Sequence, residues 1–221
     1  MILITGASSG LGAALARLYG SEGKALTLTG RDPQRLHDVA LSCGEHVTAL
    51  AASLSDPAQV TQVLDKLDTP PSMVIHCAGS GLFGPLEQQD PQAIEQLVQN
   101  NLLSSIYLLQ ELVKRYRDQK TTVVMVMSTA AQAAKAEEST YCAVKWAVKG
   151  LVESTRLELK GSAMKLVSVY PGGMATDFWP TSGKTLDSSE FMTAHEAAEM
   201  LKNALQSSQH GYISDITINR F

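Results

Sequence analysis

The chain has 221 residues, of which 44% are hydrophobic, and its formal net charge is -4 at pH 7. This length and apolar fraction suit one α/β domain with a full core. The sequence has neither a cluster of lysines and arginines nor an apolar run long enough to span a membrane, so we expect no nucleic-acid partner and no membrane partner.

The cysteines and the N-terminus indicate the compartment. Cys43, Cys77 and Cys142 are scattered, without the spacing of a metal site or a redox pair, and no cluster of histidines or carboxylates has metal-binding spacing. An apolar strand is expected directly after Met1, which leaves no room for a leader peptide. We therefore expect a cytoplasmic protein with reduced thiols and no metal.

The N-terminal residues carry the strongest local signal. A β-branched run predicts a buried strand over residues 2–4, the glycine-rich segment 5–12 follows, and a helical pattern begins after it. Gly6 suits a tight turn, Gly10 a close approach of a ligand to the backbone, and Gly12 close packing of the helix on the strand. An ordinary glycine-rich turn is the alternative, but this spacing between strand and helix favours a phosphate-binding loop.

The rest of the chain alternates between strand and helix patterns. Asp-Pro pairs suit an N-cap followed by the first helical position, and they predict helix starts near residues 32, 56 and 90, the last helix running to about 118. A further helix is expected over 141–160, and Thr193 begins a capping box. The other strands are expected at 25–29, 46–50, 73–76, 121–127, 166–169 and 212–218.

This alternation predicts a doubly wound parallel sheet, Rossmann-like, with about seven strands and helices on both faces. Residues 1–221 would form a single domain, because no linker or repeat divides them. Ligands of such sheets bind at the carboxyl ends of the strands.

Three side chains suit carbonyl chemistry. Tyr141 and Lys145 are four residues apart on a predicted helix and share one face, where the ammonium would lower the pKa of the phenol. A surface tyrosine beside a solvated lysine is the alternative. Ser128 favours the catalytic alternative, because it follows an apolar strand at the expected cleft. There Ser128 and Tyr141 would both hydrogen-bond a carbonyl oxygen.

These motifs resemble the short-chain dehydrogenase/reductase family along essentially the whole chain. The segments Thr5–Gly12 and Pro171–Thr176, together with Ser128, Tyr141 and Lys145, occur in the family's order and spacing. The resemblance implies that Ser128 positions the substrate, that Tyr141 is the acid/base, and that Lys145 also holds the nicotinamide ribose. It further implies that Asn101 ties Lys145 to a proton-relay water, although the neighbouring Asn100 leaves that assignment open.

The resemblance also implies a nicotinamide dinucleotide cofactor. Arg31 follows the second strand, where NAD-binding domains carry a carboxylate for the ribose diol, and a guanidinium there suits a 2′-phosphate. We therefore expect NADP(H) to be preferred, with NAD(H) possible. The alternative for Arg31 is an ordinary surface charge before a helix N-cap. The expected cofactor-binding residues are Gly6, Ser8, Ser9, Gly10, Leu11, Gly12, Arg31, Ser53, Leu54, Cys77, Ala78, Gly79, Tyr141, Lys145, Pro171, Gly172, Gly173, Met174 and Thr176.

Residues 177–193 match the place where the family builds its substrate loop, and Phe178, Trp179 and Phe191 make that loop aromatic. His76 ends the fourth strand, where a structural histidine is expected and a catalytic base is the alternative. The resemblance implies a homodimer or homotetramer.

The expected function is an NADP(H)-dependent oxidoreductase that interconverts a small carbonyl compound and its alcohol. A non-catalytic dinucleotide-binding sensor is the alternative.

Overall fold

The computed structural model describes residues 1–184, 186–206 and 210–220. These residues contain a seven-stranded sheet in the order β3-β2-β1-β4-β5-β6-β9, in which every neighbouring pair is parallel. The strands are β1 (Ile2–Thr5), β2 (Leu26–Gly30), β3 (Val47–Ala51), β4 (Met73–His76), β5 (Thr122–Val126), β6 (Lys165–Pro171) and β9 (Asp215–Ile218). The predicted doubly wound parallel sheet is confirmed.

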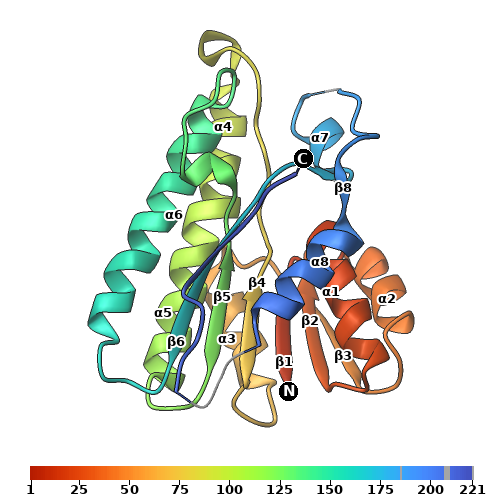
Figure 1. Cartoon of the computed structure of the whole chain (residues 1–221), viewed down its shortest axis with the longest axis vertical. Helices are drawn as coiled ribbons and strands as arrows, with labels where there is room; N and C mark the ends of the chain where they lie inside the picture. The colour runs from red at the N-terminus through yellow and green to blue at the C-terminus, as the bar shows by residue number, and fades with distance from the viewer. Residues whose placement is uncertain (185, 207–209, 221) are drawn as a thin grey trace.

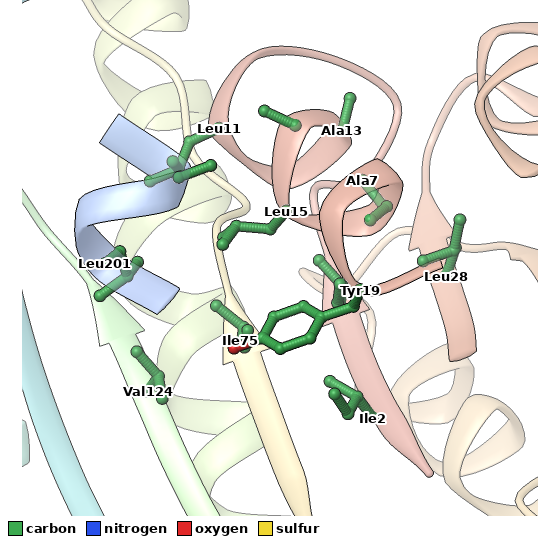
Figure 2. Close-up of a cluster of buried hydrophobic side chains, with 14 of the residues drawn as sticks. Ile2, Ala7, Leu11, Ala13, Leu15, Tyr19, Leu28, Ile75, Val124 and Leu201 are labelled. Atoms are coloured by element: carbon green, nitrogen blue, oxygen red, sulfur yellow. The ribbon is translucent and has the colours of Figure 1, made fainter. Parts of the chain in front are cut away.

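Helices cover both faces of the sheet (Figure 1). One face carries α1 (Gly10–Ser21), α2 (Pro33–Leu41) and α8 (Ala194–Ala204), and the other carries α3 (Pro57–Asp65), α5 (Ser104–Tyr116) and α6 (Ser139–Glu158). Figure 2 shows the first face, where Leu15 and Tyr19 of α1 lie near Ile75 of β4. The apolar side chains of the strands are buried on both faces, as expected for a parallel sheet.

The helix starts follow from their capping residues. Asp32 accepts hydrogen bonds from the backbone N–H groups of Gln34 and Arg35, each at 3.0 Å. Asp56 and Asp90 make equivalent caps, and a proline occupies the first helical position each time. The predicted capping box of Thr193 is also confirmed.

Two features differ from the sequence prediction. The helix expected over residues 90–118 consists of α4 (Pro91–Val98) and α5, joined by a π-helical turn, Gln99–Leu103. The chain after β6 forms β7 (Met174–Ala175), a short α7 (Phe178–Thr181) and β8 (Met192–Thr193), and β7 pairs with β8 in a second, two-stranded sheet. This small unit stands above the carboxyl ends of the main strands (Figure 1).

None of the described helices is long and apolar enough to cross a lipid bilayer.

Candidate functional site

A cavity of about 830 Å³ lies at the carboxyl ends of the strands. β2 and β4 lie on opposite sides of β1, so the crevice lies where the order of the strands reverses. Every residue predicted to act in catalysis or cofactor binding lines this cavity except Asn101. Residue 185 of the predicted substrate loop lies outside the described residues.

The three glycines of the first turn differ in what surrounds them. A Cβ on Gly6 would lie 2.6 Å from the backbone nitrogen of Ala78, and one on Gly12 would lie 2.4 Å from the carbonyl oxygen of Gly6. These two positions therefore allow close backbone packing. A Cβ on Gly10 would find Thr176 as its nearest neighbour, at 3.9 Å, so this residue leaves open space for a ligand beside the backbone.

The N-terminus of α1 suits an anion. The helix begins at Gly10, its N-cap Ser9 makes no side-chain cap, and its first turn has no acidic residue. Its first N–H groups and its partial positive charge are therefore available to a pyrophosphate. The glycine turn and this helix end together fit a dinucleotide.

Ser128, Tyr141 and Lys145 line the same cavity. Ser128 follows β5, and its hydroxyl accepts a hydrogen bond from the Ala130 N–H at 3.1 Å. Tyr141 and Lys145 come from the first turns of α6 and are only 5% and 6% exposed. The Lys145 Nζ lies 5.6 Å from the centroid of the Tyr141 ring.

Burial governs the acidity of this pair. Burial raises the pKa of the Tyr141 phenol above 10.0, and the hydrogen bond with Ser128 only partly opposes it. Burial also lowers the pKa of Lys145 to about 8. The sequence predicted a lowered pKa for Tyr141, and the structure reverses that direction because desolvation outweighs the favourable interactions.

The π-helical turn directs the two asparagines to different sides. Asn100 accepts a hydrogen bond from the Arg31 Nη1 at 3.0 Å, whereas Asn101 points inward and is 1% exposed. The Asn101 amide nitrogen donates to the carbonyl oxygens of Ser80 and Leu97. Its Oδ1 has no partner among the described residues, which leaves a buried acceptor beside the site.

Gly79 shows how close this acceptor is to the ammonium. A Cβ on Gly79 would lie 2.7 Å from the Asn101 Oδ1 and 3.3 Å from the Lys145 Nζ. Both polar atoms therefore approach the same side of Gly79, and the missing side chain leaves room for them.

Two arginines lie close to the end of β2. Arg31 follows β2, and Arg35 of α2 pairs with Asp177 of the predicted substrate loop at 3.2 Å. Both arginines line the cavity, but only Arg31 was predicted. Arg35 lies in the first turn of α2, where a charged residue is typical of a solvent-exposed helix face. The sequence therefore gave no reason to assign Arg35 to the site.

His76 has a structural role. It is 1% exposed, and its ring nitrogens pair with the hydroxyls of Thr5 and Ser105 at 2.8 and 3.1 Å. Burial lowers the pKa of His76 to about 3, so the ring is neutral. It does not line the cavity, and the expectation of a structural histidine fits this placement.

Aromatic rings and a carboxylate surround Tyr141 on the substrate side. Phe83 and Phe178 lie 5.3 and 5.9 Å from its ring, and Trp179 stacks on Phe83 at 5.7 Å. Glu138 also lines this part of the cavity. Phe83 and Glu138 were missed, although Glu138 stands only three residues before Tyr141 in the sequence.

Within the described ranges, no group of three or more histidine, cysteine, aspartate or glutamate residues is arranged to hold a metal ion.

Comparisons with known proteins agree with this geometry. Residues 1–187 match the family model described as short chain dehydrogenase. A short-chain dehydrogenase/reductase of known structure from Vibrio parahaemolyticus is 56% identical, with a TM-score of 0.93 and full coverage of both chains. One from Sphingobium yanoikuyae, in complex with NADPH, is 28% identical, with a TM-score of 0.85, over 97% of this chain and 86% of that chain. The sepiapterin reductase of Chlorobaculum tepidum is 27% identical over 95% of this chain and 91% of its own length.

Proposed function

The chain belongs to the short-chain dehydrogenase/reductase family of oxidoreductases, and from that premise we propose that it uses NADP(H) to interconvert a small carbonyl compound and its alcohol. The observation that carries the proposal is the meeting of Ser128, Tyr141 and Lys145 in the cavity that also contains the glycine turn.

The side chains have different roles in the reduction of the carbonyl group. A bound NADPH supplies the hydride that reduces the carbonyl carbon. Ser128 and Tyr141 donate hydrogen bonds to the carbonyl oxygen, and Tyr141 then transfers its proton to that oxygen. Burial supports this role, because a phenol whose pKa is raised is fully protonated at pH 7 and starts the reaction as an acid.

The proton lost by Tyr141 must be replaced from solvent. Lys145 is the nearby cation, and its pKa of about 8 makes it able to release and regain a proton near neutral pH. The unpartnered Oδ1 of Asn101 is an acceptor for a water molecule between Asn101 and Lys145. We therefore assign Asn101 a positioning role in the proton path.

Arg31 supports the preference for NADP(H). Its guanidinium stands at the end of β2, where an acidic residue would hold a ribose diol, and it forms no ion pair with a described residue. A phosphate on the ribose would give it a charged partner.

The proposal includes a homodimer or homotetramer. Trp146 and Leu157 are 49% and 76% exposed on α6. A second copy of the chain would cover these side chains, which otherwise leave apolar surface in water.

A spectrophotometric screen tests the function. Oxidation of NADPH at 340 nm is followed over ketones, aldehydes, quinones, pterins and 3-oxoacyl thioesters, with NADH in parallel. We expect turnover in at least one class and a preference for NADPH. Tight binding of NADPH without turnover in any class would instead support a dinucleotide-binding sensor.

A further inference from the structure

Glu138 places a buried carboxylate beside the reacting groups. The residue is 7% exposed, lines the cavity and is the N-cap residue of α6, three positions before Tyr141. Burial and, to a smaller extent, the charge of Glu138 raise the pKa of the Tyr141 phenol, so the carboxylate is close enough to act on that group. It therefore belongs to the substrate side of the cavity.

The carboxylate has no partner within the described part of the chain. The side chain of Glu138 accepts no hydrogen bond from the first turn of α6. Neither neighbouring lysine forms an ion pair with it, since Lys135 donates to Thr129 at 3.0 Å and Lys184 pairs with Glu137 at 3.7 Å. Because the residue lines the cavity, its carboxylate remains available to a cationic ligand there.

The surrounding rings suit the same kind of ligand. Phe83, Phe178 and Trp179 line the cavity and contact one another and Tyr141. The face of an aromatic ring attracts an ammonium ion, most strongly where water is excluded. A carboxylate beside several aromatic faces is therefore suited to an organic cation.

We propose that Glu138 selects substrates that carry a protonated amine near the reacting carbon, so that the protein acts on amino alcohols and amino ketones. This inference rests on the proposed oxidoreductase function and names its substrate class. Glu138 immediately precedes α6 and Tyr141 lies in the first turn of that helix, so the amine would stand within a few bonds of the carbon that Tyr141 serves. Glu138 is thus a specificity-determining residue that contacts the substrate.

A pair of isosteric alcohols tests the selection. 1-Amino-2-propanol and 2-butanol differ in that an ammonium group replaces a methyl group, and NADP⁺ oxidises either one to a ketone with release of NADPH and a proton. We expect kcat/KM of the wild-type protein to be at least tenfold higher for the amine. In Glu138→Gln the ratio of the two values should fall to near one.

The control variant is Glu137→Gln, which removes the same charge from an exposed neighbour outside the cavity lining. We expect it to keep the wild-type ratio. A wild-type ratio near one, or a ratio that Glu138→Gln leaves unchanged, would overturn the inference while leaving the oxidoreductase function intact.

A binding measurement separates this inference from the reaction. Calorimetric titration of the NADPH-saturated protein compares benzylammonium with benzyl alcohol, neither of which is oxidised in that complex. We expect at least tenfold tighter binding of the cation by the wild type and by Glu137→Gln, and no preference in Glu138→Gln. This result without turnover of any alcohol would support the cation site and refute the reaction, whereas equal binding of both probes by the wild type would refute the cation site.

Discussion

Replacing Lys145 with methionine should make the protein more stable at neutral pH. Lys145 is 6% exposed, and burial lowers its pKa from 10.5 to about 8. One pKa unit corresponds to about 1.4 kcal/mol, so the buried charge costs the folded state about 3 kcal/mol at pH 7. Methionine has a similar shape without the charge, and Lys145→Met should therefore raise the free energy of unfolding by about that amount.

The pH dependence identifies the cause. Below pH 8 the lysine is charged in both the folded and the unfolded chain, so the full cost is present. Between pH 8 and 10.5 the unfolded chain binds more protons than the folded one, and wild-type stability gains from this group as the pH rises. The gap between variant and wild type should therefore shrink to less than half of its value by about pH 9.5.

Urea unfolding followed by circular dichroism at pH 7, 8, 9 and 9.5 measures the gap. Taking the difference between the two proteins largely removes the contribution of other groups, such as Cys77, whose pKa burial raises to about 12. Lys149→Met is the matched control, because Lys149 lies one turn further along α6 and is partly exposed. It should change stability by less than about 0.5 kcal/mol at every pH. A variant less stable than wild type at pH 7, or a gap independent of pH, would refute the reasoning.

Three further substitutions test other parts of the structure. In fluorescence titrations, Arg31→Ala should raise the Kd of NADPH at least tenfold and leave the Kd of NADH within about twofold. Arg17→Ala is the control, because Arg17 lies outside the cavity lining, and it should change neither Kd. Equal losses of affinity for both cofactors would contradict the assignment of Arg31. Gly79→Ala places a Cβ 2.7 Å from the Asn101 Oδ1 and so displaces the proposed proton path. We expect kcat to fall at least tenfold while the circular dichroism spectrum stays unchanged. A normal kcat would argue against the proton path. Asp32→Ala removes two hydrogen bonds from the start of α2 and should cost about 1 kcal/mol of stability in urea unfolding, whereas no loss would show that the cap is unimportant.

The succession of strands and helices along the chain could be predicted because its signals are local. Short apolar strands, glycine turns and Asp-Pro caps act within a few residues, and each had its expected effect. Strand ends shifted by one to three residues, as for β9, which begins at Asp215 rather than at 212.

The features that could not be predicted depend on distant contacts. The π-helical turn at 99–103 turns Asn101 inward, and no pattern in its own sequence distinguishes it from Asn100. The direction of the pKa of Tyr141 depends on how many groups bury the phenol, which spacing along the helix cannot reveal. Glu138 likewise reads as an ordinary helix cap until the cavity is seen beside it.

The proton transfer from Tyr141 is the central claim, and a single-turnover measurement with Tyr141→Phe tests it most directly. The variant keeps the ring in its aromatic surroundings and removes only the hydroxyl. With saturating NADPH and a carbonyl substrate identified by the screen, we predict that the rate of NADPH oxidation falls at least a thousandfold while the Kd of NADPH stays within about threefold. A rate within tenfold of the wild type would contradict the assignment of Tyr141 as the proton donor.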